Sequence, residues 1–139
     1  VTAGPTVEVI DPVRYVSNRS SGKMGYAIAE ALRDKGAIVT LISGPTHLSL
    51  PEGINVVKVE SADDMFQAVT ERFAKQDIVI KAAAVSDYTP MDILEHKLKK
   101  QEGGLSVQFK RTKDILKYLG ENKTHQYLVG FAAETQNIE

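Results

Sequence analysis

Apolar strand-like runs alternate with amphipathic helix-like segments along most of this chain, and this alternation restricts its fold more than any other feature. The apolar runs lie at residues 1–4, 38–42, 54–59, 77–82 and 127–132. The run at 77–82 is mostly apolar, as is typical of a strand covered on both faces. Strands that alternate with helices pair in parallel and are joined by right-handed crossovers. The sequence therefore predicts an α/β fold with a mainly parallel sheet.

Two segments have the residue spacing of an amphipathic helix. The first, at 23–35, places apolar side chains three or four positions apart and is followed by Gly36, a residue that commonly ends helices. The second begins after Ser61, a suitable N-cap, and is expected to extend to Ala74. A strand at 105–109 and a short helix at 113–119 complete the expected elements. Together they predict a Rossmann-like three-layer αβα fold in one domain spanning residues 1–139.

The composition excludes several classes of partner. The net charge of −1 gives no overall field that would attract nucleic acid or an anionic membrane. No apolar run approaches the ~20 residues of a membrane-spanning helix. The chain has no cysteine, so it has no disulfide framework and no thiolate nucleophile, which fits a cytoplasmic protein.

A glycine-rich turn at 18–25, Asn-Arg-Ser-Ser-Gly-Lys-Met-Gly, separates the first strand from the first helix. Backbone amides at a helix N-terminus favour anions, so the turn is predicted to bind phosphate. The residues of this predicted site are Ser20, Ser21, Gly22, Lys23, Met24 and Gly25. In the alternative interpretation, the glycines only allow the helix to pack closely on the strand.

An NAD(P)-binding oxidoreductase domain is an alternative that the sequence disfavours. The distance along the chain from Gly4 to Gly22 is too long for the fingerprint G-x-G-x-x-G. A dinucleotide site also needs an acidic residue at the end of the second strand, where this chain has Ser43-Gly44-Pro45. A non-catalytic nucleotide-binding module is the second alternative.

The segment at 87–104, which we call the flap, interrupts the alternation of strands and helices. It contains Pro90, Gly103 and Gly104 and carries the cluster Lys97-Leu98-Lys99-Lys100. Long loops in compact domains are commonly functional, and these lysines could close over a polyphosphate. A short lysine run is equally typical of a solvated face.

Five segments of the chain, in order, resemble phosphopantothenoylcysteine synthetase. They are residues 1–6, 11–25, 82–88, 97–100 and 129–135. The resemblance implies a ligase that joins 4′-phosphopantothenate to L-cysteine, using CTP with Mg²⁺ or Mn²⁺. It implies that an acyl-cytidylate forms first with release of pyrophosphate, and that cysteine then displaces CMP. It further implies a homodimer and, in many bacteria, fusion to a decarboxylase domain that would carry FMN.

The resemblance also assigns residues to the site. Asn18 matches the asparagine that binds the acyl intermediate, and Lys97 matches the lysine needed to form it. Nucleotide-binding positions carried over by motif are Lys81, Ala82, Ala83, Asp87, Lys97, Lys113, Asp114, Ile115, Leu116 and Phe131. Lys113 departs from the family pattern, which often has proline there. Members of the family continue past Glu139, so we expect this domain to lack its C-terminal part. Metal ligands are not identified.

Overall fold

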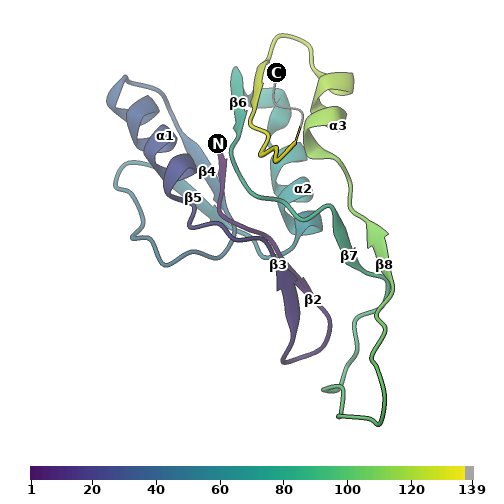
Figure 1. Ribbon diagram of the computed structural model, residues 1–139. Coiled ribbons are helices and arrows are strands. Elements are labelled where there is room, and N and C mark those ends of the chain that lie inside the picture. Colours follow the sequence, from purple (N-terminus) through teal and green to yellow (C-terminus); the bar gives the residue numbers. More distant parts are fainter. Residues whose placement is uncertain (137–139) are drawn as a thin grey trace.

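In the computed structural model, which describes residues 1–136, five parallel strands form the central sheet (Figure 1). They are β1 (Thr2–Ala3), β4 (Thr40–Ser43), β5 (Asn55–Lys58), β6 (Ile78–Lys81) and β9 (Tyr127–Gly130). Their order across the sheet is β5-β4-β1-β6-β9, so the chain builds outward from β1 first in one direction and then in the other. The predicted parallel sheet is confirmed. Open sheets of this kind bind ligands beyond the carboxyl ends of the strands, where the order reverses.

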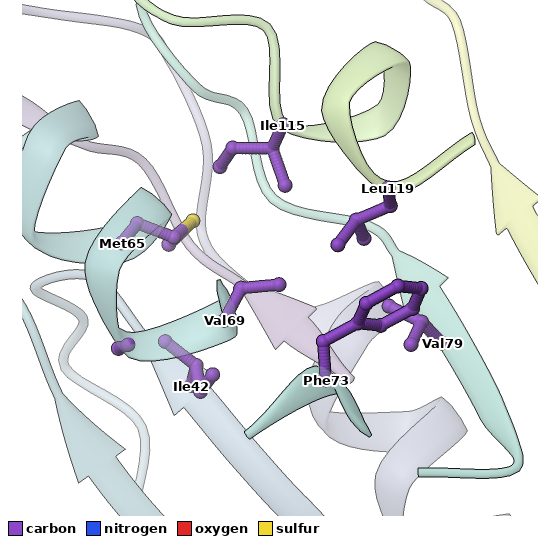
Figure 2. Close-up of a cluster of buried hydrophobic side chains, with 8 residues drawn as sticks. Ile42, Met65, Val69, Phe73, Val79, Ile115 and Leu119 are labelled. Atoms are coloured by element: carbon purple, nitrogen blue, oxygen red, sulfur yellow. The ribbon is translucent and has the colours of Figure 1, made fainter. Parts of the chain in front are cut away.

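Helices cover both faces of the sheet. Helix α1 (Lys23–Asp34) packs on one face, where the buried apolar residues are Ala3, Tyr26, Ala29, Val39 and Leu41. Helices α2 (Ala62–Thr70) and α3 (Ile115–Asn122), with the short 3₁₀ helix η1 (Phe73–Lys75), pack on the other. The core on that side contains Ile42, Met65, Ala68, Val69, Phe73, Val79, Ile115 and Leu119 (Figure 2). The three-layer arrangement is therefore confirmed.

Side-chain caps set two of the helix starts. Ser61 caps α2 by accepting a hydrogen bond from the Asp64 amide, and the Asp64 carboxylate accepts one from the Ser61 amide in return. The Asp114 side chain accepts from the Lys117 amide at the start of α3. The expected helix at 113–119 thus begins two residues later than predicted and ends at Asn122.

The prediction that the second helix extends to Ala74 is wrong. Helix α2 ends at Thr70, and the chain continues as the 3₁₀ turn η1. The Thr70 hydroxyl donates back to the carbonyl oxygens of Phe66 and Gln67, at 2.9 and 3.1 Å. Such back-bonding competes with the regular helical ladder and accompanies bends in helices.

Two antiparallel strand pairs lie outside the central sheet. Strands β2 (Val7–Val9) and β3 (Tyr15–Ser17) form a hairpin between β1 and α1, where no strand was predicted. Strand β7 (Tyr88–Pro90) pairs with β8 (Phe109–Arg111). The predicted strand at 105–109 is therefore wrong except at Phe109, because pairing occurs only where the chain lies opposite β7.

The flap begins with β7 and extends away from the central sheet beside the β2–β3 hairpin (Figure 1). The Leu94 amide donates to the Ile10 carbonyl oxygen at 3.0 Å, which fixes the flap to the hairpin. No helix of the described chain is long and apolar enough to cross a membrane.

Candidate functional site

Three glycines meet at the carboxyl end of β1. Gly4 and Gly22 both have the positive φ that favours glycine, 76° and 77°. A Cβ atom on Gly22 would lie 3.4 Å from the Gly4 Cα atom, and one on Gly25 would lie 2.4 Å from the Ala3 Cβ atom. Gly22 and Gly25 thus bring the start of α1 against β1 so closely that a side chain at Gly25 would collide.

Gly4, Gly22 and Gly25 occupy positions like those of the three glycines in a dinucleotide-binding fingerprint. Here a long insertion separates the first glycine from the second. The first glycine of such a motif makes the tight turn, the second allows a phosphate to approach, and the third allows close helix packing. The β2–β3 hairpin is inserted between Gly4 and Gly22, which explains why their spacing along the sequence was too long. The carboxylate that an NAD site needs after the second strand is still lacking, since β4 ends at Ser43.

The start of α1 has the features of an anion site. No side chain caps the helix, and its first turn contains no acidic residue. The Gly22 and Lys23 amides already donate to the hydroxyls of Ser20 and Ser21, at 3.3 and 3.4 Å, so a phosphate at this turn would be bound by other groups or would replace these hydroxyls. Because the helix dipole favours negative charge here, the turn can receive a phosphate without a basic pocket around it.

Asn18 lies between this turn and the end of β6. Its Nδ2 atom donates to the Ala84 carbonyl oxygen at 3.2 Å. The structure therefore brings together two of the motifs singled out in the sequence, although they lie 66 residues apart in the chain.

A cleft of about 790 Å³, which we call the α3 cleft, opens between the end of β6, strand β8 and helix α3. Five of the predicted nucleotide-binding residues line it: Lys81, Asp87, Lys113, Asp114 and Ile115. They come from two distant parts of the chain, before and after the flap. A volume in this range is typical of pockets for small molecules and cofactors.

Other residues of the α3 cleft were not predicted from the sequence. Arg111 and Lys117 add positive charge, while Phe66 and Tyr118 form an aromatic wall with ring centroids 5.0 Å apart. The Lys113 Nζ atom lies 4.9 Å from the centre of the Phe66 ring and 3.1 Å from an Asp63 carboxylate oxygen. No local pattern could have identified Phe66, because it reaches the cleft only through the packing of α2 against α3.

The remaining predicted residues lie outside the lining of the α3 cleft. The amides of Ala82 and Ala83 donate to the Thr2 carbonyl oxygen and the Thr2 hydroxyl, at 3.3 and 3.2 Å. These two amides already form hydrogen bonds within the protein, so a nucleobase at this strand end would be recognised by other groups. Leu116 packs at the position where a Cβ on Gly130 would lie, and Phe131 is 52% exposed just beyond β9.

Lys97 lies on the flap and is exposed to solvent. Its neighbour Leu98 is bound to Asp11, a carboxylate whose side chain is fully buried at the end of the β2–β3 hairpin. The Leu98 amide, followed by the amides of Val13 and Arg14, lowers the pKa of Asp11 to about 2. The carboxylate is therefore charged at neutral pH.

A second cleft, of about 660 Å³, adjoins the first and shares Arg111, Thr112 and Lys113 with it. Glu8 of β2 lies in its wall with only 2% of its surface exposed, and both of its oxygens accept from the Ala62 amide. Burial raises the pKa of Glu8. Within residues 1–136, no group of three or more His, Cys, Asp or Glu side chains is arranged to hold a metal ion.

Comparisons with known proteins identify the family. The sequence model described as "DNA/pantothenate metabolism flavoprotein C-terminal domain" matches residues 1–139. The chain belongs to this family. The resemblance stated from the sequence is thereby confirmed.

The relatives are longer proteins. The chain is 58% identical to the coenzyme A biosynthesis bifunctional protein CoaBC of Bacillus subtilis (strain 168) and 51% identical to that of Haemophilus influenzae. Each alignment covers the whole chain but only 34 or 35% of the relative, so the chain spans about a third of their length. A crystal structure of the C-terminal domain of a CoaBC protein is 53% identical, with a TM-score of 0.86, and the match covers 98% of this chain and 64% of that one.

Proposed function

We propose that this chain is the nucleotide-binding part of a CTP-dependent ligase that joins 4′-phosphopantothenate to L-cysteine. The observation that carries the proposal is the α3 cleft, where Lys81 and Asp87 meet Lys113 and Asp114 from the other side of the flap. The relative with 58% identity is a coenzyme A biosynthesis protein, which supports this substrate class.

A carboxylate is a poor electrophile, so the proposed reaction has two steps. In the first, a carboxylate oxygen of phosphopantothenate attacks the α-phosphorus of CTP, and pyrophosphate leaves. In the second, the cysteine amine attacks the acyl carbon, the amide bond forms, and CMP leaves. Preorganised cations stabilise the charge that develops on the phosphates in the first step.

Four cationic side chains of the α3 cleft, Lys81, Arg111, Lys113 and Lys117, suit the polyphosphate of a nucleotide. We propose that the uncapped start of α1 binds a further phosphate and that Lys97 approaches the reacting phosphates from the flap. Asn18, held at the Ala84 carbonyl, is proposed to bind the acyl intermediate during its capture by cysteine.

The residues present fit a magnesium ion that the nucleotide itself carries. Mg²⁺ is commonly bound by one or two carboxylates together with substrate phosphates. Asp87 and Asp114 are the aspartates of the α3 cleft, and Asp114 already accepts the Lys117 amide. When bound, the ion would neutralise phosphate charge, and Asp87 is the side chain that we propose to contact it.

A homodimer is supported by exposed apolar residues of the hairpin, of the flap and of the position that directly follows the flap. Val13, Tyr15, Met91, Ile93 and Leu105 are each at least half exposed. Large exposed apolar patches are typical of interaction surfaces. We propose that a second copy covers them and brings the subunit boundary near Asn18. We also propose that the chain is fused to a decarboxylase domain that binds FMN and that the protein is cytoplasmic.

Thermal unfolding with CTP, ATP and NAD, each with and without Mg²⁺, tests the nucleotide site. We expect CTP with Mg²⁺ to raise the melting temperature most, because ligands that bind only the folded state stabilise it. Lys113→Ala should reduce this increase, whereas Lys35→Ala, at an exposed position beyond α1, should not.

Each competing interpretation has its own outcome. Equal stabilisation by CTP and ATP would contradict the preference for CTP. Stabilisation by NAD alone would favour the oxidoreductase domain. Stabilisation by CTP without release of pyrophosphate, when the intact protein also receives phosphopantothenate, would favour a non-catalytic module.

A further inference from the structure

The flap is attached to the β2–β3 hairpin next to Lys97. The Leu98 amide donates to Asp11 Oδ2 at 3.0 Å, and Arg14 Nη1 donates to the Leu98 carbonyl oxygen at 2.9 Å. Leu98 is thus held through both of its backbone polar groups. The contact from Leu94 to Ile10 adds a second attachment four residues earlier.

The two oxygens of Asp11 have different partners. Oδ1 accepts from the Val13 and Arg14 amides, at 2.8 and 2.7 Å, and these bonds stay within the hairpin. Oδ2 accepts from the Leu98 amide and from Arg14 Nη1, both at 3.0 Å. The first bond joins the hairpin to the flap, and the second orients the arginine that donates to the Leu98 carbonyl oxygen. A buried carboxylate with four donors forms strong charge-assisted hydrogen bonds.

We propose that Asp11 is a positioning residue for Lys97. The Leu98 nitrogen belongs to the planar peptide unit that contains the Lys97 carbonyl, so fixing this nitrogen also restricts the Lys97 Cα atom. The lysine side chain then extends from a fixed point, and less conformational freedom is lost when it meets the phosphates. This inference rests on the proposed function, in which Lys97 acts in the first step.

The substitution Asp11→Asn distinguishes the role of Oδ2 from that of Oδ1. Asparagine keeps an oxygen that can accept from Val13 and Arg14, but it replaces Oδ2 with an NH₂ group that cannot accept from the Leu98 amide. Asp34→Asn is the matched control, because Asp34 pairs with Arg33 at an exposed position on α1.

The test measures pyrophosphate release from CTP and phosphopantothenate in the intact protein, with rates normalised to the folded fraction. We expect Asp11→Asn to lower kcat by roughly 10- to 100-fold, since small misplacements of a reacting group cost this much, with a smaller change in KM for CTP. Asp34→Asn should release pyrophosphate at the wild-type rate.

A double-mutant cycle with Lys97→Gln distinguishes positioning from a general structural effect. If Asp11 acts through Lys97, adding Asp11→Asn to the Lys97→Gln protein should lower the rate no further. Losses that multiply, or a wild-type rate for Asp11→Asn alone, would overturn the positioning role. A wild-type protein that releases no pyrophosphate would instead overturn the proposed function, and the positioning role with it.

Discussion

Glycine is required at some positions of this structure and could be replaced at others, depending on whether there is room for a Cβ atom. Gly25 lies inside α1 with its Cα against β1, where an added Cβ would approach the Thr2 carbonyl oxygen to 2.9 Å. Gly120 lies inside α3, where an added Cβ would meet nothing within 4 Å. Both positions gain helix propensity from alanine, so packing alone separates them.

Gly25→Ala and Gly120→Ala should therefore change stability in opposite directions. We expect Gly120→Ala to raise the free energy of unfolding by about 0.5–1 kcal/mol, and Gly25→Ala to lower it by about 1–3 kcal/mol through overpacking. Urea unfolding followed by circular dichroism measures both. A Gly25→Ala protein as stable as the wild type would contradict the close packing of α1 on β1.

Glu8 should make stability depend on pH. Burial raises its pKa above the ordinary value of 4.5, so the folded state binds the proton more tightly than the unfolded state. Stability therefore falls as pH rises from the ordinary pKa through the raised one. Glu8→Gln should remove this loss, so the difference in free energy of unfolding between variant and wild type should grow with pH across this window. A difference that stays constant from pH 4 to 7 would show that the pKa of Glu8 is not raised.

Part of the site could be predicted residue by residue. The resemblance assigned Lys81, Asp87 and Lys113 to one nucleotide site, and all three line the α3 cleft. Lys81 and Asp87 lie at and just beyond the end of β6, the edge of a parallel sheet where ligands bind. Arg111 and Phe66 could not be predicted in this way. Their positions depend on the pairing of β7 with β8 and on the packing of α2, and both involve contacts between distant parts of the chain.

At the scale of elements, the long helices and buried strands were predictable, and the short paired strands were not. Strand β2 shows why, because its one buried residue is Glu8 while the valines on either side are partly exposed. This reverses the polarity expected of a strand with one face in the core. Strand β8 is exposed along its whole length and contains one apolar residue, Phe109, so it is too short and too polar to show an alternating pattern.

Ser61→Ala tests the cap at the start of α2, and Ser86→Ala is its control. Ser61→Ala removes a capping box and should lower the free energy of unfolding by about 1 kcal/mol. Ser86 is buried, and its hydroxyl has no hydrogen-bond partner among the described residues, so Ser86→Ala should leave stability unchanged or raise it. Thermal unfolding of both variants under one set of conditions is sufficient. A larger loss for Ser86→Ala than for Ser61→Ala would point to a partner for the Ser86 hydroxyl.

At the scale of the whole molecule, the flap extends away from the core (Figure 1). Its attachments at Leu94 and Leu98 precede Lys99 and Lys100, which are exposed. Segments with few buried contacts open easily and are cut first by proteases. We expect trypsin to cleave after Lys99 or Lys100 in the free protein and much more slowly with CTP and Mg²⁺. Equal cleavage rates would indicate that these lysines form a solvated face.

The position of β1 has a consequence for how the chain folds. This two-residue strand lies at the centre of the sheet, and Thr2 pairs with Ile42 on one side and Lys81 on the other. Each pairing closes a long loop, whose entropic cost must be met before the contact contributes any stability. Strands β4 and β5 and helix α2 pack on segments that are closer in sequence than the partners of β1 are, so we expect them to form first. In pulsed hydrogen exchange during refolding, the amides that join β1 to β4 and β6 should therefore be among the last in the sheet to become protected. The glycine turn that begins beside β1 would then be complete only when folding itself is complete.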